Sequence, residues 1–249
     1  MIYRISLLFL LFGSFINAKT ITIAVAANVS YAIDDLKKEF SKRYPNVKVR
    51  VVLGGSGKLT AQIKHGAPYQ LFMSADMKYP ELLYKEKVAI TKPIVYAQGS
   101  LAYLSVKSRD FTNPIELLKE KNIKHIAIAN PKTAPYGRAA FEALRNAKIL
   151  NQIKSKFIYG ESITQTVSYS ITAADIGLVA KSSLYSPKMK RYKKGVNWYE
   201  VDKKLYTPIK QGIVILKSAN KDKDVKAFYN FMLSVDAKKI LSHFGYLSL

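Results

Sequence analysis

The chain repeats one local pattern four times: an apolar run, a short loop rich in Gly, Ser, Asn or Pro, and the start of a helix. The four instances span Ile21–Tyr31, Val47–Lys58, Ile126–Arg138 and Phe157–Thr164. The apolar runs predict buried strands, and the segments after the loops have helical spacing. A helix N-terminus has unpaired backbone N–H groups and a positive dipole end, which suits it to an anion. Several such ends in one crevice would hold an anion without a charged side chain.

The same patterning predicts strands and helices in alternation along the whole chain. Expected strands lie at 20–25, 47–53, 71–74, 101–106, 126–129, 157–159, 176–180 and 211–216, and expected helices at 31–44, 59–65, 79–87, 136–147, 163–172, 224–235 and 237–244. This order predicts an α/β fold with mostly parallel sheets flanked by helices. We expect two lobes, residues 19–98 with 210–249 and residues 99–209, joined by two crossings, with a cleft between them.

The first 18 residues have the pattern of a secretory signal peptide. Arg4 gives a basic start, an apolar run covers residues 5–16, and Ala18 is the small residue after which we expect cleavage. The run is shorter than the roughly 20 apolar residues that a membrane-spanning helix needs. The pattern therefore predicts an exported protein.

The amino-acid composition limits which cellular compartment and which binding partners are expected. The chain has no cysteine, which excludes disulfides, thiolate metal sites and a lipid-modified N-terminal cysteine. An exported protein without that lipid is expected in a bacterial periplasm. The formal net charge of +23 is typical of nucleic-acid binding, but export argues against such a partner. Except in the basic segment Lys188–Lys194, the lysines are scattered, which indicates a solvated surface whose positive field speeds the approach of small anions.

The sequence contains no recognisable catalytic motif. Gly54–Lys58 resembles part of a phosphate-binding P-loop, but Val52 and Leu59 stand where that motif needs Gly and Ser or Thr. The three histidines, at positions 65, 125 and 243, have no Glu or His at metal-ligand spacing. No Ser/His/Asp triad is evident, so we expect no enzyme activity, no metal ligated directly by the protein and no cofactor.

Small polar residues in the four loops are better candidates for a site. Asn28 and Ser56 can each donate a hydrogen bond, and the glycines beside Ser56 let backbone approach a ligand closely. Ser and Asn are also favoured as helix caps, so capping remains an alternative role for both residues.

Short pieces along essentially the whole mature chain resemble the periplasmic molybdate-binding proteins of ABC transporters. The pieces are Ala26-Ala27-Asn28, Gly55-Ser56-Gly57, Ala61-Gln62-Ile63, His65-Gly66-Ala67-Pro68, Leu71-Phe72-Met73-Ser74-Ala75-Asp76, Ala129-Asn130-Pro131, Ala134-Pro135-Tyr136-Gly137, Ala173-Ala174-Asp175-Ile176-Gly177 and Phe244-Gly245-Tyr246. Each piece is weak alone, whereas their order and spacing together are specific.

The resemblance implies a two-lobed periplasmic binding protein, a Venus flytrap of type II, that holds a tetrahedral dianion between its lobes with neutral donors. The implied ligands fall on Ala27, Asn28, Ser56, Tyr136 and Ile163. Asn28 and Ser56 would donate from side chain and backbone, and Tyr136 and Ile163 from backbone N–H groups. The resemblance implies that the ligand is molybdate or tungstate. It also implies that the protein passes this metal oxyanion to an inner-membrane ABC permease for transport, and that it is a monomer.

Three positions depart from the commonest family pattern. Many members have Ser where this chain has Asn28, Tyr where it has Ala180, and Asp where it has Gln70. A subgroup of the family resembles this chain at the first two. The change at Ala180 removes one hydroxyl donor.

Other functions remain open on the sequence. A binder of sulfate, phosphate or an organic anion would share the fold; an Arg or carboxylate in the cleft would favour the last two. None stands at the implied positions, although Lys58 and Arg138 are close by. An exported hydrolase or transferase would need a triad or metal cluster, and an adhesive protein would bind no anion.

Overall fold

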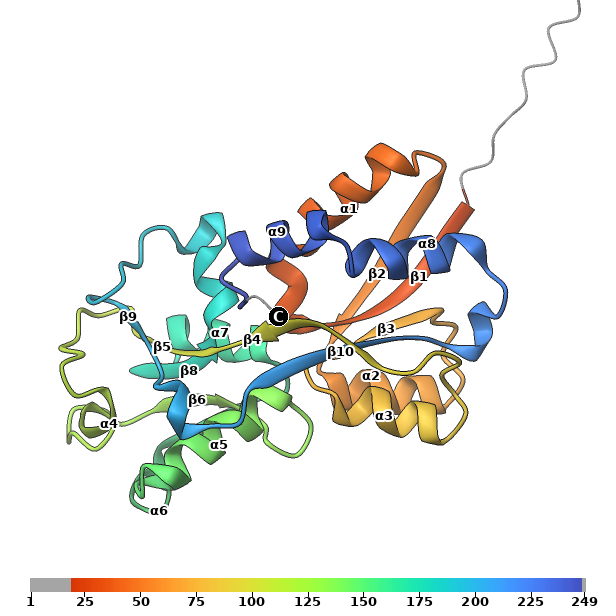
Figure 1. Cartoon of the computed structure of the whole chain (residues 1–249). Helices are drawn as coiled ribbons and strands as arrows, with labels where there is room; N and C mark the ends of the chain where they lie inside the picture. Colours follow the sequence, from red (N-terminus) through yellow and green to blue (C-terminus); the bar gives the residue numbers. More distant parts are fainter. Residues whose placement is uncertain (1–18, 248–249) are drawn as a thin grey trace, which may run out of the picture.

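In the computed structural model, which describes residues 19–247, the chain forms two five-stranded sheets flanked by helices (Figure 1). The first sheet and its helices are here named the first lobe, and the second sheet and its helices the second lobe. The signal peptide expected at residues 1–18 lies outside the described residues. Within residues 19–247, no helix is long and apolar enough to cross a bilayer.

The first sheet is built from both ends of the described chain. In spatial order its strands are β2 (Val47–Gly54), β1 (Lys19–Ala26), β3 (Leu71–Met73), β10 (Ile209–Ile215) and β4 (Ile94–Gly99). β1 pairs in parallel with β2 and β3, whereas β10 is antiparallel to β3 and β4.

The second sheet takes its strands from the middle of the chain. Their spatial order is β7 (Phe157–Gly160), β6 (Ile126–Ala129), β8 (Ile176–Ala180), β5 (Leu101–Leu104) and β9 (Trp198–Glu200). β6 is parallel to β7 and β8, and β5 is antiparallel to β8 and β9.

Both sheets are thus mixed, where the sequence indicated mostly parallel ones. One antiparallel pair, β4 with β10, arises because these strands carry the chain out of the first lobe and back again, and therefore run in opposite directions. The first sheet draws on residues 19–99 and 209–215, and the second on 101–200. The lobe boundaries expected after residues 98 and 209 stay a prediction; the sheets separate within one residue of them.

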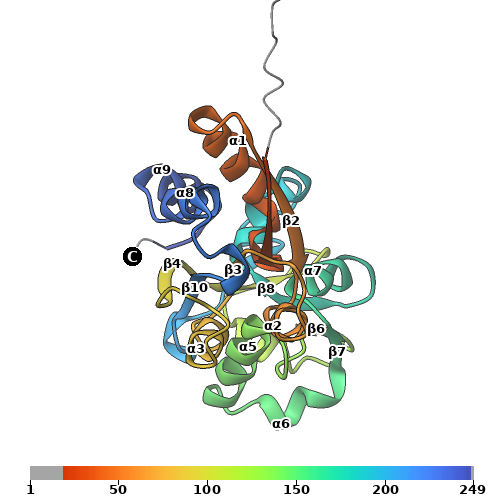
Figure 2. The same ribbon diagram turned by 90° about the vertical axis from the view of Figure 1, so that its right-hand side faces the viewer.

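Helices cover both faces of the first sheet, as Figures 1 and 2 show. Its helices are α1 (Ile33–Arg43), α2 (Ser56–Lys64), α3 (Lys78–Lys85), α8 (Lys223–Met232) and α9 (Val235–His243), and those of the second lobe are α4 (Pro114–Leu117), α5 (Pro135–Asn146), α6 (Leu150–Ile153) and α7 (Ile163–Thr172). Alternate residues of β10 point to opposite faces. Ile213 packs with α1, α8 and α9, and Val214 packs with α2 and α3.

Two expected elements differ in detail. The helix expected at 31–44 is preceded by a separate 3-10 helix, Ala27–Tyr31, so Asn28 lies in a helical turn rather than in a loop. The segment 186–195, expected as a polar surface loop, contains a short 3-10 helix at Pro187–Met189. Met189 and Tyr192 of this segment are buried, while its lysines and Arg191 are exposed.

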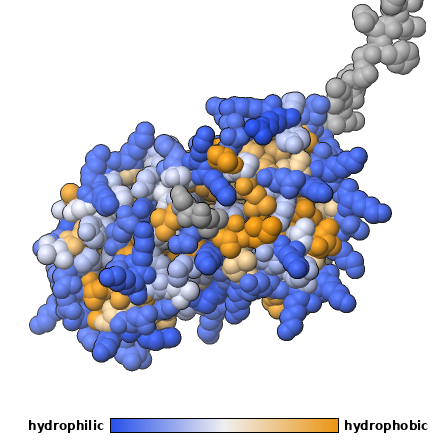
Figure 3. Space-filling view, viewed as in Figure 1, coloured by the Kyte–Doolittle hydropathy of each residue, from blue (hydrophilic) through white to orange (hydrophobic). Residues whose placement is uncertain are grey.

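Hydrophilic residues cover most of the face in Figure 3, with hydrophobic areas near its centre. This agrees with the burial of the described residues 19–247, among which no Lys or Arg is buried.

Candidate functional site

All five residues that the resemblance singles out line one small cavity between the lobes. The cavity encloses about 210 Å³ of space, part of it open to solvent. Its lining consists of Ala26, Ala27, Asn28, Gly54, Gly55, Ser56, Ala75, Ala134, Pro135, Tyr136 and Ile163. The five predicted residues come from four segments that lie far apart in sequence, and Ala75, which follows β3, adds a fifth segment to the lining. A role for these residues in ligand binding stays a prediction.

Each of the four segments that carry the predicted residues begins a helix at the cavity. The 3-10 helix at Ala27 follows β1, and α2 begins at Ser56 directly after β2. On the second lobe, α5 begins at Pro135 and α7 at Ile163. The first N–H groups of a helix have no partner within it, so four sets of donors and four positive dipole ends meet here.

The two helices of the second lobe each leave a defined donor. Pro135 is the first residue of α5 and has no N–H, so the first available donor of that helix is the N–H of Tyr136. In α7, the Ser162 side chain caps the helix by accepting from the N–H of Gln165 at 3.2 Å. That cap leaves the N–H of Ile163, in the first turn, outside the intrahelical bonds.

Ser56 offers a hydroxyl hydrogen to the cavity. Its side chain is 1% exposed, and its Oγ accepts a hydrogen bond from the N–H of Ala75 at 3.0 Å. A serine hydroxyl can donate once as well as accept. Capping does not account for this side chain, because it forms no cap hydrogen bond in α2.

The side chain of Asn28 is bound within the protein. Its Nδ2 donates to Gln211 Oε1 at 2.9 Å and to Tyr246 Oη at 2.8 Å, which uses both amide hydrogens. Its Oδ1 is buried and has no partner within the described residues. The backbone N–H of Asn28, in the first turn of its helix, is the donor that remains for a ligand.

The electrostatics of the cavity come from dipoles rather than from full charges. None of the eleven lining residues has a charged side chain at neutral pH. Burial raises the pKa of the Tyr136 phenol well above its usual value, so this side chain also stays neutral. Lys58 and Arg138 do not line the cavity.

Three hydrogen bonds join the two lobes beside the cavity, and a backbone carbonyl accepts each of them. Gly57 N–H in the first lobe donates to the carbonyl oxygen of Thr133 in the second at 3.1 Å. Thr164 Oγ1 donates to the carbonyl of Ala27 at 3.1 Å. Ser182 Oγ donates to the carbonyl of Asn28 at 3.2 Å. The two lobes are therefore in direct contact at the cavity.

An ion pair also crosses between the lobes at the rim. Arg138 of α5 pairs with Asp76, which follows β3, and its guanidinium lies 5.3 Å from the centre of the Tyr79 ring. The Tyr79 hydroxyl donates to the carbonyl of Thr133 at 3.3 Å. The sequence placed Arg138 near the site but gave no sign of its partner.

Comparison with known proteins agrees with this geometry. Residues 21–247 match the family described as bacterial extracellular solute-binding proteins. The chain is 34% identical over 232 residues to the molybdate-binding protein ModA of Azotobacter vinelandii, covering 92% of this chain and 90% of that one. It is 32% identical over 233 residues to ModA of Rhodobacter capsulatus, covering 93% of this chain and 89% of that one. The match to the structure of the Azotobacter vinelandii periplasmic molybdate-binding protein has a TM-score of 0.84 at 30% identity, covering 92% and 99%.

This chain is a bacterial extracellular solute-binding protein. Membership accounts for the two lobes, the two strands that cross between them, and the cavity enclosed where they meet.

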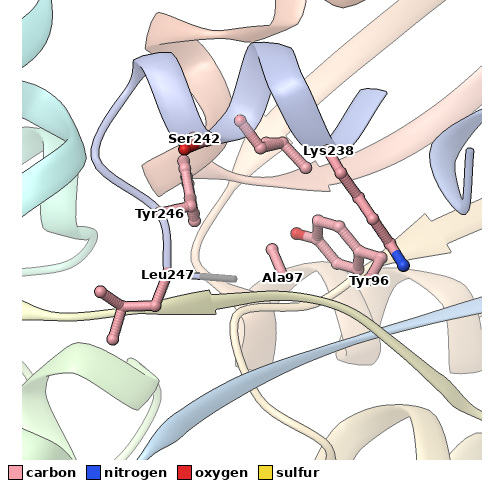
Figure 4. A pocket seen from close by; sticks show the side chains of 7 residues that line it. Tyr96, Ala97, Lys238, Ser242, Tyr246 and Leu247 are labelled. Atoms are coloured by element: carbon pink, nitrogen blue, oxygen red, sulfur yellow. The ribbon is translucent and has the colours of Figure 1, made fainter. Parts of the chain in front are cut away.

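A second cavity of this solute-binding protein lies between β4 and α9. Tyr96 and Lys238 line it from opposite sides, and Tyr246 and Leu247 close one end (Figure 4). Tyr246 also holds Asn28 of the first cavity through two hydrogen bonds, so its hydroxyl lies between the two spaces. Sequence reasoning missed this link, because Tyr246 and Asn28 are 218 residues apart.

The described residues of this solute-binding protein hold no cluster of His, Cys, Asp and Glu that could bind a metal ion directly. His65 caps the end of α2, His125 precedes β6, and His243 is the last residue of α9.

Proposed function

We propose that this solute-binding protein captures molybdate, and also tungstate, in the periplasm and delivers it to an inner-membrane ABC permease. The observation that carries the proposal is the single small cavity lined by Ala27, Asn28, Ser56, Tyr136 and Ile163. Relatives at 34% and 32% identity over most of the chain are molybdate-binding proteins, which supports the same ligand.

The ligand is held by neutral donors. We assign the backbone N–H groups of Ala27, Asn28, Tyr136 and Ile163 and the hydroxyl of Ser56 to the anion. Helix N-termini suit a dianion because their N–H groups and dipoles are fixed before the ligand arrives. The positive net charge of the chain speeds the encounter with an anion.

Selectivity follows from the size of the cavity and its set of donors. Molybdate and tungstate are nearly equal in size and bind alike. Sulfate is smaller and would leave some donors unpaired. Each unpaired buried donor lowers the binding free energy of sulfate by about 1–3 kcal/mol. A cation or acid group in the cleft would favour phosphate or an organic acid, and the lining has neither.

We further propose a signal peptide cleaved near Ala18, lobes divided after residues 98 and 209, and a monomer that acts by binding, without catalysis and without a nucleic-acid partner. The nearest alternative function is capture of another oxyanion such as sulfate or phosphate.

A thermal melt of the mature protein with molybdate, tungstate, sulfate or phosphate tests the function. A ligand at 100 times its Kd adds about 2.7 kcal/mol, which raises the Tm of a chain this size by roughly 5–10 °C. We expect that shift with molybdate and tungstate. A shift with sulfate or phosphate alone would favour the alternative, and no shift with any anion would overturn oxyanion capture.

The double variant Ser56→Ala with Asn28→Ala tests the site. It removes the hydroxyl donor and the side chain that holds the first helical turn in place. Molybdate binding that is unchanged in this variant would overturn the site assignment while leaving the fold and family untouched.

A further inference from the structure

Gln211 of β10 has a polar side chain that is fully buried, whereas its neighbour Lys210 in the strand is exposed. Its Oε1 accepts hydrogen bonds from Asn28 Nδ2 and from Tyr96 Oη, both at 2.9 Å. Its Nε2 donates to Tyr136 Oη at 3.1 Å. A buried carboxamide bonded at both ends fixes the orientation of the groups that it contacts.

The partners of Gln211 come from both lobes. Asn28 belongs to the first lobe and Tyr136 to the second, and both line the anion cavity. The Gln211–Asn28 bond stays within the first lobe, whereas the Gln211–Tyr136 bond forms only when α5 meets β10. The Gln211 side chain therefore bonds to a residue of each lobe, and both residues line the anion cavity.

Gly99 makes room for this contact. It ends β4, the outward crossing strand, and a Cβ there would lie 2.0 Å from Tyr136 Oη and 2.7 Å from Gln211 Nε2. The Tyr136 hydroxyl is thus held against both crossing strands, β4 and β10. The same residue lines the anion cavity at the first turn of α5.

We propose that Gln211 is a positioning residue that couples closure of the lobes to the geometry of the anion site, through the chain Asn28–Gln211–Tyr136. This inference rests on the proposed function. When the lobes open, Gln211 Nε2 loses its acceptor on α5. When they close around an anion, the bond forms again and holds the N-terminus of α5 against the hinge. The relay slows release of the anion and leaves the rate of capture unchanged.

The variant Tyr136→Phe removes the hydroxyl of the relay and keeps the ring and the backbone N–H. It leaves the buried Gln211 Nε2 without its acceptor, so we expect the Kd for molybdate to be about tenfold higher. The whole change should appear in the dissociation rate, because the lost bond exists in the closed state alone. The melting temperature without ligand should match that of the control variant.

Tyr69→Phe is the matched control. The Tyr69 hydroxyl donates to Gln62 Oε1 at 3.1 Å, so it is also a buried tyrosine bonded to a glutamine, but both residues lie in the first lobe. We expect its Kd and dissociation rate for molybdate to equal those of the wild type.

Gln211→Met, alone and combined with Tyr136→Phe, completes the test. Residues in one relay are not additive, so the double variant should bind no more weakly than the weaker single variant. If Gln211→Met does not fold, the dissociation rates of Tyr136→Phe and its control Tyr69→Phe still test the relay. Equal dissociation rates in Tyr136→Phe and Tyr69→Phe would overturn the relay alone. A wild type that binds no molybdate would overturn the proposed function as well.

Discussion

Gly57 and Thr133 join the two lobes through backbone atoms alone. The N–H of Gly57, in the first turn of α2, donates to the Thr133 carbonyl, which lies just before α5, at 3.1 Å. A Cβ at position 57 would lie 2.8 Å from that oxygen and 3.1 Å from the Thr133 Cα. Glycine here permits a close approach of two backbones that any other residue would obstruct.

Gly57→Ala should therefore keep the lobes from closing fully. Overpacking of about 1–3 kcal/mol corresponds to a Kd for molybdate roughly five- to 150-fold higher. Stability without ligand should not fall, since Ala is better than Gly in a helix and the open form has no obstacle. Small-angle X-ray scattering with saturating molybdate should show a larger radius of gyration than for the wild type. Compaction equal to that of the wild type would contradict this role of Gly57.

Ser56→Ala should weaken molybdate binding. A hydrogen bond to a charged group contributes about 1.5–3 kcal/mol, which corresponds to a loss of roughly ten- to a hundredfold in affinity, measured by titration calorimetry. Ser170→Ala is the control: it is also buried, and its hydroxyl donates to the Thr166 carbonyl at 2.7 Å within α7. Equal affinities for the two variants would show that the Ser56 hydroxyl does not contact the anion.

Asn28→Asp should be more damaging than Asn28→Ala. Both variants lose the donor to Gln211 and Tyr246. The aspartate also places a negative charge at the cavity, where it repels a dianion and faces Gln211 Oε1. We expect no detectable molybdate binding for the aspartate variant by calorimetry and weakened binding for the alanine variant. Similar affinities for the two would mean that the anion lies away from this side chain.

Local sequence signals suffice for the four strand–helix junctions of the cavity. Each junction combines an apolar run with Gly, Ser, Asn or Pro, and these residues end strands or begin helices through their own backbone preferences. The predicted helix at 163–172 agrees with α7 residue for residue. No local pattern predicts that the four junctions meet at one cavity. That prediction came from the family resemblance.

Long-range pairing explains what the sequence did not reveal. β4 was not predicted, because its partner β10 lies more than 100 residues away and pairs Gln98 with Lys210. Gln211 gave no signal in the sequence beyond its polar side chain next to an apolar run, since its partners Asn28 and Tyr136 are 183 and 75 residues distant. Such contacts depend on the fold and have no short-range pattern.

Arg138→Gln should speed the release of molybdate. The Asp76–Arg138 ion pair is partly exposed and joins the lobes, so its loss should raise the dissociation rate about two- to fivefold at low salt, and less at high salt. Lys64→Gln is the control, because the Lys64–Glu86 pair at 2.8 Å lies within the first lobe. A fall in the association rate instead would mean that Arg138 acts by attracting the anion.

The buried tyrosines should make the protein lose stability in alkali. Burial raises the pKa of Tyr96, Tyr136 and Tyr246 well above the ordinary value of 10.0. The unfolded chain then releases protons that the folded protein retains, so the free energy of unfolding falls as the pH rises. Their contribution is complete below pH 10.0 and is lost as the pH rises from there toward the raised folded-state values.

Urea denaturation at a series of pH values measures this loss. Tyr136→Phe should show a shallower decline above the ordinary pKa of tyrosine, about 10, because one buried phenol is absent. Tyr44→Phe, at an exposed tyrosine, should follow the wild type. If the decline of Tyr136→Phe equals that of the wild type, the Tyr136 hydroxyl ionises alike in the folded and unfolded states. It could not then be the neutral partner that Gln211 requires.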